Sequence, residues 1–325
     1  MAHVTLCEMS PRDGLQFLGG EKTASPRLIP LEFKLRLIEA LRAARLPYIE
    51  VGAFVSPKVT PQMADSDVLG PRLTARPDER LAALVPNARH YARFRASGLN
   101  TVALFVSASE AYAQANTRSS VEDLMTWAGE VAALARAEGK SLRAHVSAAF
   151  QELTAGATFD PKRVVDLTRR LIELGCACVA LADTNGETNP RRIRELLAIV
   201  EREVGLEHVG VHLHDRNGAG LANALAALDA GVRTFDASLG GIGGSATAAG
   251  LKSGAARAAG NIATEELADM LERMGVQTGV DLDALARAGE LLFEITRQTG
   301  DFAPPSRLLR ERLGYGVIWA REPAG

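Results

Sequence analysis

Eight short β-prone runs, each followed by a helical or loop segment, limit what this chain can fold into more than any other feature. The predicted strands cover residues 4–9, 48–52, 81–85, 101–106, 142–147, 177–182, 208–213 and 232–237. Apolar residues recur with helical spacing between them, most clearly at 121–138, 161–174 and 190–204. Eight such repeats predict an α/β fold, a closed (β/α)8 TIM barrel, with an open doubly wound sheet as the alternative.

The doubly wound alternative has little support, because no Gly-x-Gly-x-x-Gly segment opens a helix after the first predicted strand. Two further helices, at about 265–274 and 282–298, are predicted to be appended to the barrel. We therefore expect residues 1–300 to form a single barrel domain with its appended helices, and residues 301–325 to form a loosely held tail.

The balance of charge favours a small-molecule ligand over a large anionic partner. The 325 residues include 37 basic and 39 acidic side chains, a formal net charge of −2, so no strong field points to nucleic acid or to a membrane surface. With 47% hydrophobic and 23% charged residues, the composition is typical of a soluble globular protein.

The cysteines and the N-terminal residues predict a cytoplasmic protein. Cys7, Cys176 and Cys178 are few and odd in number, unlike a disulfide framework, and fit a reducing compartment. The chain begins with a strand-like run rather than a signal peptide, and it has no apolar run of 18 residues that could cross a membrane.

Two histidines in the seventh predicted strand are candidate metal ligands. Residues alternate between the two faces of a strand, so His212 and His214 present both imidazoles on one face. Asp215 and a turn containing Gly218 follow at once, and neutral imidazoles are common ligands of divalent cations. Other segments must supply oxygen ligands, and the alternative is a pair of ordinary core histidines.

Polar residues also stand where other predicted strands end, which in a TIM barrel is the substrate face. They are Arg12 and Asp13, Glu50, Asp183 and Thr184, and the glycine-rich loop 238–244. Each has a structural alternative. Arg12 and Asp13 would form an ion pair in a turn, Glu50 would be a buried acid paired with Arg12, and residues 183–186 would be a plain turn.

Several motifs, taken in order, resemble those of one enzyme family. They are Pro-Arg-Asp-Gly-Leu-Gln at 11–16, Phe-Val-Ser-Pro-Lys at 54–58 with Pro-Gln-Met at 61–63, Phe-Val-Ser-Ala-Ser-Glu at 105–110, and Val-His-Leu-His-Asp at 211–215. The pattern resembles the 3-hydroxy-3-methylglutaryl-CoA (HMG-CoA) lyases, members of a metal-dependent lyase and aldolase superfamily that shares a TIM barrel. The likeness extends from residue 4 to residue 298.

The resemblance implies a catalytic Mg²⁺ or Mn²⁺ ion, for which the ligands would be Asp13, His212, His214 and, in the segment Gly-Asn-Ile-Ala-Thr-Glu at 260–265, Asn261. Two imidazoles with carboxylate and amide oxygens leave coordination positions for substrate. It also implies a retro-Claisen cleavage of a 3-hydroxyacyl-CoA. A base takes the hydroxyl proton, and a ketone and a thioester enolate separate.

The resemblance assigns further residues around this ion. Arg12 matches the residue expected to stabilise the enolate oxygen, and Glu50 and Asp183 match acidic positions around the site. We predict that Gln16 and Thr184 bind the substrate, an acyl-CoA. We also expect a homodimer, which is ordinary for such barrels.

One departure from the family concerns the proton donor. The family's loop reads Gly-Leu-Gly-Gly-Cys-Pro, with an acid/base cysteine, whereas residues 241–247 read Gly-Ile-Gly-Gly-Ser-Ala-Thr. Ser245 is several pK units less acidic than a thiol, whose reference pKa is about 8.5, so it is a poor catalytic acid without a partner.

Three interpretations therefore stay open. The chain is a lyase for another hydroxy acid or acyl-CoA that draws its proton from water, His145 or another loop. Alternatively, it is a genuine HMG-CoA lyase with a weakened donor. The third interpretation is a protein that binds metal and ligand without turnover, although retention of all four metal ligands speaks against it.

Overall fold

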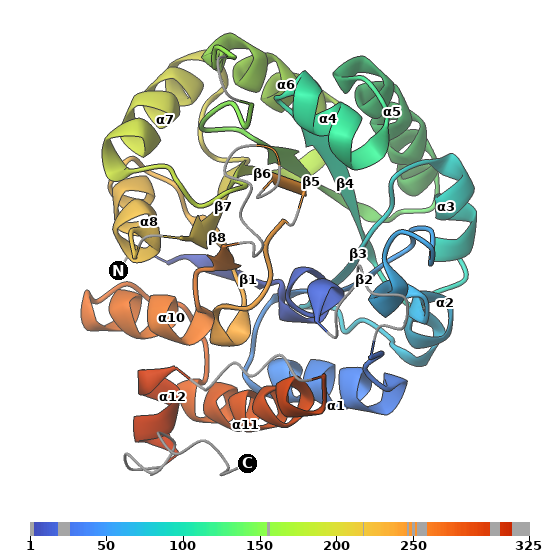
Figure 1. The fold of residues 1–325 in the computed structure, drawn as a ribbon, viewed down its shortest axis with the longest axis vertical. Helices are drawn as coiled ribbons and strands as arrows, with labels where there is room; N and C mark the ends of the chain where they lie inside the picture. Colours follow the sequence, from blue (N-terminus) through green and yellow to red (C-terminus); the bar gives the residue numbers. More distant parts are fainter. Residues whose placement is uncertain are drawn as a thin grey trace.

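The computed structural model of the chain describes residues 3–18, 27–154, 157–216, 218–245, 247–248, 251, 259–299 and 306–313. Its parallel strands are β1 (Thr5–Glu8), β2 (Tyr48–Ala53), β3 (Arg80–Leu84), β4 (Thr101–Ser107), β5 (Ser141–Ser147), β6 (Cys176–Asp183), β7 (Val209–Asp215) and β8 (Thr234–Ala237). Each pairs with the next along the chain, and β1 also pairs with β8 (Figure 1). The predicted TIM barrel is confirmed. The alternative, an open doubly wound sheet, is wrong because the first and last strands of an open sheet do not pair, whereas β1 and β8 do.

Helices surround the barrel on its outside (Figure 1). They are α1 (Leu31–Ala43), α2 (Ser66–Leu69), α3 (Ala88–Phe94), α4 (Glu110–Thr117), α5 (Val121–Ala137), α6 (Pro161–Glu173), α7 (Pro190–Val204), α8 (Gly220–Asp229), α10 (Thr264–Arg273), α11 (Leu282–Thr299) and α12 (Arg307–Arg312). Local signals fix several starts: Ser120 and Asp123 form a capping box at α5, and Asn189 caps α7. Helix α7 has its predicted bounds, because the cap, the proline at its first position and the apolar spacing agree.

The main apolar core lies between the barrel and the helices. Leu6 and Ile49 belong to this large buried cluster, whereas their strand neighbours Cys7 and Tyr48 belong to a small separate one. Alternation along a strand explains the separation, because successive side chains point to opposite faces of the sheet.

The barrel interior contains a buried ion pair. Arg143 of β5 donates a hydrogen bond to Asp236 of β8, and both residues are buried. The Arg143 guanidinium also lies 4.6 Å from the centroid of the Tyr48 ring. Barrel interiors are usually filled by branched apolar side chains, so this polar filling is a particular feature of the chain.

Two short elements lie near the carboxyl ends of the strands. The turn predicted after β1 is a tight π-helical turn, η1 (Ser10–Gly14). A short strand, β9 (Gly260–Asn261), runs antiparallel to β7 and pairs Asn261 with His214. The sequence does not predict β9, because two residues are too few to show a period of two.

Part of the predicted tail, residues 306–313, contains a helix rather than a loose segment. Ser306 caps α12, and Leu309 is 1% exposed. A Cβ added at Gly289 of α11 would lie 2.6 Å from a Leu309 methyl carbon, so the two helices are in close contact. The other tail residues, 301–305 and 314–325, lie outside the described residues.

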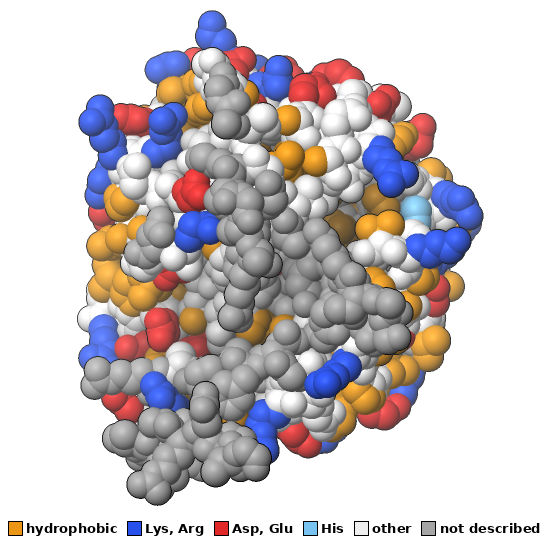
Figure 2. Space-filling model, viewed as in Figure 1, with side chains coloured by type: hydrophobic (Ala, Val, Ile, Leu, Met, Phe, Trp, Pro, Cys, Tyr) orange, Lys and Arg blue, Asp and Glu red, His pale blue; other side chains and the backbone are white. Residues whose placement is uncertain are grey.

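The surface shows mixed charge. Figure 2 shows basic and acidic side chains distributed around the periphery of one face, in keeping with 37 basic and 39 acidic residues in the sequence. Within the described ranges, no helix combines the length and the apolar character needed to cross a membrane.

Candidate active site

The four predicted metal ligands meet at the carboxyl ends of the strands. Asp13 comes from η1, His212 and His214 from β7, and Asn261 from β9. Ligand atoms of Asp13, His212 and His214 lie within 4.8 Å of one another, and all three residues are buried. The Asn261 amide donates to Asp13 Oδ2 at 2.7 Å, which brings the fourth side chain to the same point.

Hydrogen bonds leave one ring nitrogen of each imidazole free to bind a cation. His214 Nδ1 lies 2.8 Å from the carbonyl oxygen of Asp183, and it carries a proton because a carbonyl can only accept. His212 Nδ1 lies 3.1 Å from a carboxylate oxygen of Asp236, which favours the same tautomer. The Nε2 atom of each ring therefore keeps its lone pair.

Two atoms of this cluster lack a hydrogen-bond partner. Within the described part of the chain, His214 Nε2 and Asn261 Oδ1 are buried and unsatisfied. Leaving a buried polar atom unsatisfied costs about 1–3 kcal/mol. Both atoms can donate an electron pair, and with the Asp13 carboxylate they form a nitrogen and oxygen set that suits a divalent cation. The residues present therefore fit Mg²⁺ or Mn²⁺.

The charges around Asp13 favour its role as an anionic ligand. Burial alone raises the pKa of the Asp13 carboxyl, but Arg12 and the two imidazoles outweigh burial and hold this pKa well below its ordinary value. Burial lowers the pKa of His212. Burial also opposes protonation of His214, yet Asp13 raises the pKa of that imidazole. A cation therefore competes with a proton at His214.

A second cluster, formed by His145, His212 and Asp236, shares a member with the first. His145 Nδ1 lies 3.6 Å from the Asp236 carboxylate that also bonds His212, and His145 Nε2 lies 2.9 Å from Glu50. These atoms already have partners, so the cluster orients the His212 ring rather than offering a second ion site. His145, one of the alternative proton sources, is held between two acids.

Sequence reasoning missed Asp236 and Arg143. The available signal is alternation: Arg143 precedes His145 by two residues and so lies on the same face of β5. Asp236 is an acid inside the predicted strand at 232–237, between Phe235 and Ala237. Such a residue must find a partner when it is buried, but the sequence does not say which one.

Arg12 is held by two carboxylates. Its Nε donates to Glu50 at 2.5 Å and its Nη1 donates to Asp13 at 2.6 Å. Glu50 is fully buried and also accepts from the Tyr48 hydroxyl at 3.1 Å. Burial alone raises the pKa of Glu50, but Arg12 and His145 outweigh it, so the net shift is downward. Both structural alternatives, the Arg12 and Asp13 ion pair and a buried Glu50 that anchors Arg12, are therefore present.

Asp183 ends β6 with one carboxylate oxygen unsatisfied. Its Oδ2 accepts from the backbone N–H of Thr188 at 3.2 Å, whereas Oδ1 is buried without a partner among the described residues. Burial raises the pKa of this carboxyl to about 6. A carboxyl group with a free oxygen and a pKa near neutrality can exchange protons with a ligand, so the segment has chemistry that a plain turn does not need.

The two residues predicted to bind substrate lie near these groups. Gln16 Nε2 is 3.4 Å from Asp13 Oδ1. Thr184 Oγ1 accepts from the backbone N–H of Ala148 at 2.7 Å, and Ala148 has a positive φ of 56°. Thr184 thus stabilises an unusual backbone turn after β5, while substrate binding by either residue stays a prediction.

The glycine loop after β8 packs against the metal ligands. The Gly244 N–H donates to Asp13 Oδ2 at 3.2 Å. Gly243 has a φ of 112°, a conformation that favours glycine. A Cβ at Gly243 would lie 2.4 Å from Asn261 Nδ2 and 2.7 Å from Asp13 Oδ2. The close approach of this backbone to the ligands therefore depends on the missing side chain.

Ser245 follows this close approach and has a hydroxyl partner. Its Oγ lies 2.9 Å from the hydroxyl of Tyr112 and accepts from the backbone N–H of Ala248 at 3.1 Å. Sequence reasoning missed Tyr112, which lies 133 positions from Ser245 in the chain. The one available signal is its place just after the motif at 105–110.

We expect Gly243→Ala to weaken Mn²⁺ binding roughly 10- to 100-fold, the usual effect of disturbing groups that orient metal ligands. The added methyl group would displace Asn261 or Asp13. Calorimetric titration with Mn²⁺ measures the change. Gly139→Ala is the matched control, because Gly139 also has a positive φ, of 67°, but nothing within 4 Å of its Cβ position. Equal Mn²⁺ affinity in both variants would show that the contact is unimportant.

A buried acid beside the same loop makes stability depend on pH. Glu265 of α10 accepts from the Gly240 N–H at 3.1 Å, and burial raises the pKa of this carboxyl from 4.5 to about 7. Between these values the folded protein keeps a proton that the unfolded chain has lost. The contribution of Glu265 to the free energy of unfolding is therefore present at low pH and lost as the pH rises through about 7.

Glu265→Gln is expected to remove this pH dependence. Relative to the variant, the metal-free wild type should lose up to roughly 3 kcal/mol of unfolding free energy between pH 4.5 and pH 7. Urea unfolding at several pH values measures the difference. Glu266→Gln, at the partly exposed neighbouring position, should behave as the wild type. Parallel curves for the wild type and Glu265→Gln would contradict the assignment.

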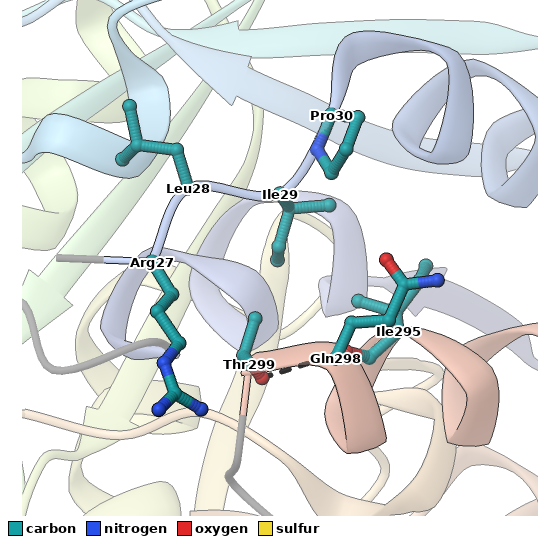
Figure 3. Close-up of a pocket in the computed structure, with 7 residues that line it drawn as sticks. All are labelled: Arg27, Leu28, Ile29, Pro30, Ile295, Gln298 and Thr299. Carbon is teal, nitrogen blue, oxygen red and sulfur yellow. Dashed lines mark hydrogen bonds between the residues drawn. The ribbon is translucent and has the colours of Figure 1, made fainter.

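A separate pocket of about 170 Å³ lies between the segment before α1 and the end of α11 (Figure 3). Its lining residues are Arg27, Leu28, Ile29, Pro30, Ile295, Gln298 and Thr299. None of them carries a carboxylate or an imidazole, so the pocket cannot supply the ligand set described above.

The chain is similar to known proteins along most of its length. It matches the family described as HMGL-like over residues 3–292. It is 38% identical over 287 residues to the 3-hydroxy-3-isohexenylglutaryl-CoA/hydroxymethylglutaryl-CoA lyase of Pseudomonas aeruginosa, covering 88% of this chain and 91% of that protein. A crystal structure of hydroxymethylglutaryl-CoA lyase from Pseudomonas aeruginosa has a TM-score of 0.85 at 35% identity, covering 97% of this chain and 98% of that one. An HMG-CoA lyase from Acinetobacter baumannii, in complex with coenzyme A and 3-methylmalate, has a TM-score of 0.83 at 30% identity, covering 99% and 98%.

Proposed function

Because the chain belongs to the HMGL-like family, we propose that it is a divalent-metal-dependent carbon–carbon lyase that cleaves a 3-hydroxyacyl-CoA by a retro-Claisen reaction. The observation that carries this proposal is the convergence of two unsatisfied ligand atoms, His214 Nε2 and Asn261 Oδ1, on the Asp13 carboxylate. Arg12 lies against the same carboxylate. A cation site beside a fixed guanidinium suits a reaction that builds negative charge on a thioester oxygen.

The metal would be held by Asp13, His212, His214 and Asn261. When bound there, it supplies a Lewis acid that polarises the substrate's hydroxyl and a neighbouring oxygen.

The other residues would move a proton and stabilise charge. Asp183, with its unsatisfied Oδ1, takes the proton of the substrate's hydroxyl group. The carbon–carbon bond then breaks, and its electron pair moves into the thioester as an enolate while the hydroxyl carbon becomes a ketone. Arg12, oriented by Glu50, donates hydrogen bonds to the enolate oxygen.

The proposed substrate class draws on the relatives. One related structure contains coenzyme A and 3-methylmalate, and one related lyase is named for two acyl-CoA substrates. We infer that the substrate is a 3-hydroxyacyl-CoA other than HMG-CoA, with HMG-CoA itself as the second candidate. The related lyases that carry HMG-CoA in their names favour the second candidate, whereas Ser245 in place of the family cysteine favours a different substrate.

The test is a screen of metal-loaded protein. HMG-CoA, 3-hydroxyacyl-CoAs that differ in the substituent at C3, and free hydroxy acids are incubated with Mg²⁺ or Mn²⁺, and the products are identified by mass spectrometry. We expect at least one acyl-CoA to be cleaved to a shorter acyl-CoA and a ketone, and a chelator to stop the reaction. Metal binding without cleavage of any acyl-CoA would favour the interpretation as a binding protein.

We also keep the cytoplasmic location and the homodimer as proposals. The three cysteines are free thiols in the structure, which suits a reducing compartment. Light scattering during gel filtration would measure the subunit number.

A further inference from the structure

Tyr112 and Ser245 form a hydroxyl pair beside the metal ligands. Their oxygen atoms lie 2.9 Å apart, and Tyr112 is 4% exposed. Ser245 directly follows Gly244, the N–H of which contacts the Asp13 carboxylate. The Tyr112 hydroxyl is therefore bonded to the residue that follows a contact with a metal ligand.

The hydrogen bonds of Ser245 determine where its proton can go. A serine hydroxyl can accept two hydrogen bonds and donate one. The Ala248 N–H occupies one acceptor position of Ser245 Oγ. If Tyr112 donates to the other, the Ser245 proton is left to donate to a third group. Among the described residues the Tyr112 hydroxyl bonds only to Ser245, which favours this direction.

Three loops fix the phenol in place. The Tyr112 N–H donates to Ser109 Oγ at the start of α4, and the Ser109 hydroxyl donates to Glu152 at 2.7 Å. The Tyr112 side chain packs in a small buried cluster with residues from the loops after β5 and β8, namely Ala148, Leu153 and Ala248. The backbone and the ring of Tyr112 are therefore both held by contacts with neighbouring loops.

We propose that Tyr112 is a relay residue that supplies, through Ser245, the proton for the carbon of the thioester enolate, an inference that rests on the lyase reaction proposed above. The Ser245 O–H bond breaks as a C–H bond forms from the electron pair of the enolate. The Tyr112 proton moves to Ser245 Oγ, and the negative charge comes to rest on the Tyr112 oxygen. Solvent then returns a proton to Tyr112, and the base releases to solvent the proton that it took from the substrate.

The acidity of a phenol explains why the pair can replace a thiol. Serine alone would be left as an alkoxide, whereas a phenol has a reference pKa of about 10, close to the value of about 8.5 for a thiol. Burial raises the pKa of Tyr112 to about 12, so the phenol keeps its proton at neutral pH; it is a weaker acid than a free phenol but still a stronger one than an aliphatic alcohol. The relay thus moves the final charge from an aliphatic oxygen to an aromatic one.

Tyr112→Phe removes the hydroxyl and keeps the ring. In the Mn²⁺-loaded protein, we expect kcat for acyl-CoA cleavage to fall roughly 100-fold, within the usual range for general acid catalysis, with KM changed less than about twofold. Exchange of the α-hydrogens of acetyl-CoA with D₂O should fall by a similar factor, because exchange requires the same proton transfer without bond cleavage. Ser245→Ala should cause the same loss, and the double variant should lose little more.

The Ser245→Cys background separates a relay from a structural role. A thiol can donate its own proton, so adding Tyr112→Phe to Ser245→Cys should cost less than about twofold in both assays. The matched control is Tyr91→Phe in α3. It removes a phenol hydroxyl that donates to Glu138 at 2.8 Å, and it should leave the rates in both assays unchanged.

The possible outcomes distinguish the relay from the lyase reaction. Wild-type rates in Tyr112→Phe would overturn the relay alone. The same holds if Tyr112→Phe lowers the rates equally in the protein with Ser245 and in the Ser245→Cys variant. A wild type that binds Mn²⁺ but neither cleaves any acyl-CoA nor exchanges acetyl-CoA hydrogens would overturn the lyase reaction and the relay with it.

Discussion

His212→Ala should reduce kcat/KM for acyl-CoA cleavage by at least about 10³-fold and leave no measurable Mn²⁺ binding at concentrations that saturate the wild type. This loss of activity is expected because polarisation of the substrate by the metal stabilises the transition state by several kcal/mol, and each 1.36 kcal/mol changes a rate about tenfold. His212 Nε2 is free because Asp236 occupies Nδ1, so the variant loses a ligand that is already oriented. Calorimetric titration and steady-state kinetics measure the two effects.

Two further variants make this result specific. Asp13→Asn keeps the shape of the side chain but removes its charge, and it should weaken Mn²⁺ binding while leaving the fold intact. His208→Ala, at an exposed position just before the same strand, should bind Mn²⁺ as the wild type does. Undiminished Mn²⁺ binding in both His212→Ala and Asp13→Asn would defeat the metal assignment.

At saturating Mn²⁺, Arg12→Lys should lower kcat by roughly 10²- to 10³-fold, the cost of removing one donor that stabilises an oxyanion. Because Arg12 also bonds the ligand Asp13, Mn²⁺ binding should weaken by up to roughly 10- to 100-fold. The guanidinium bonds Glu50 through Nε and Asp13 through Nη1, a two-sided geometry that a single ammonium group cannot reproduce. Steady-state kinetics with a cleaved acyl-CoA measure the loss.

The Arg12 result needs a control for the loss of a buried ion pair. Arg42→Lys changes a guanidinium of α1 that bonds the Glu79 carboxylate, in a pair of side chains that are only 8% and 9% exposed, and it should leave kcat unchanged. The midpoint of thermal unfolding is compared in both variants. An Arg12→Lys enzyme with normal kcat would exclude Arg12 as the group that stabilises the enolate.

The buried polar groups of the barrel explain how the site keeps its geometry. Asp236 bonds both Arg143 and His212, and Glu50 bonds both Arg12 and His145. Asp236 and Glu50 are therefore each paired with a guanidinium and an imidazole. Buried charges are tolerated when they are paired in this way. The pairing also holds His212 and Arg12 in position.

The sequence by itself determined the order and the approximate bounds of the barrel elements. The predicted helix at 190–204 has the same bounds in the structure, and the predicted strand at 142–147 differs by one residue. Alternation and helical spacing are local properties, as are the cap at Asn189 and the proline after it. The sequence also placed His212 and His214 on one face, because a strand has a period of two.

Only the tertiary structure decided how distant side chains combine. Asn261 meets Asp13 across 248 positions, and Tyr112 meets Ser245 across 133. The free Nε2 atoms, the pKa of about 6 at Asp183 and the polar filling around Asp236 all depend on burial and on partners from other strands. No local pattern records such partners, because closing the barrel brings them together and burial then fixes their protonation.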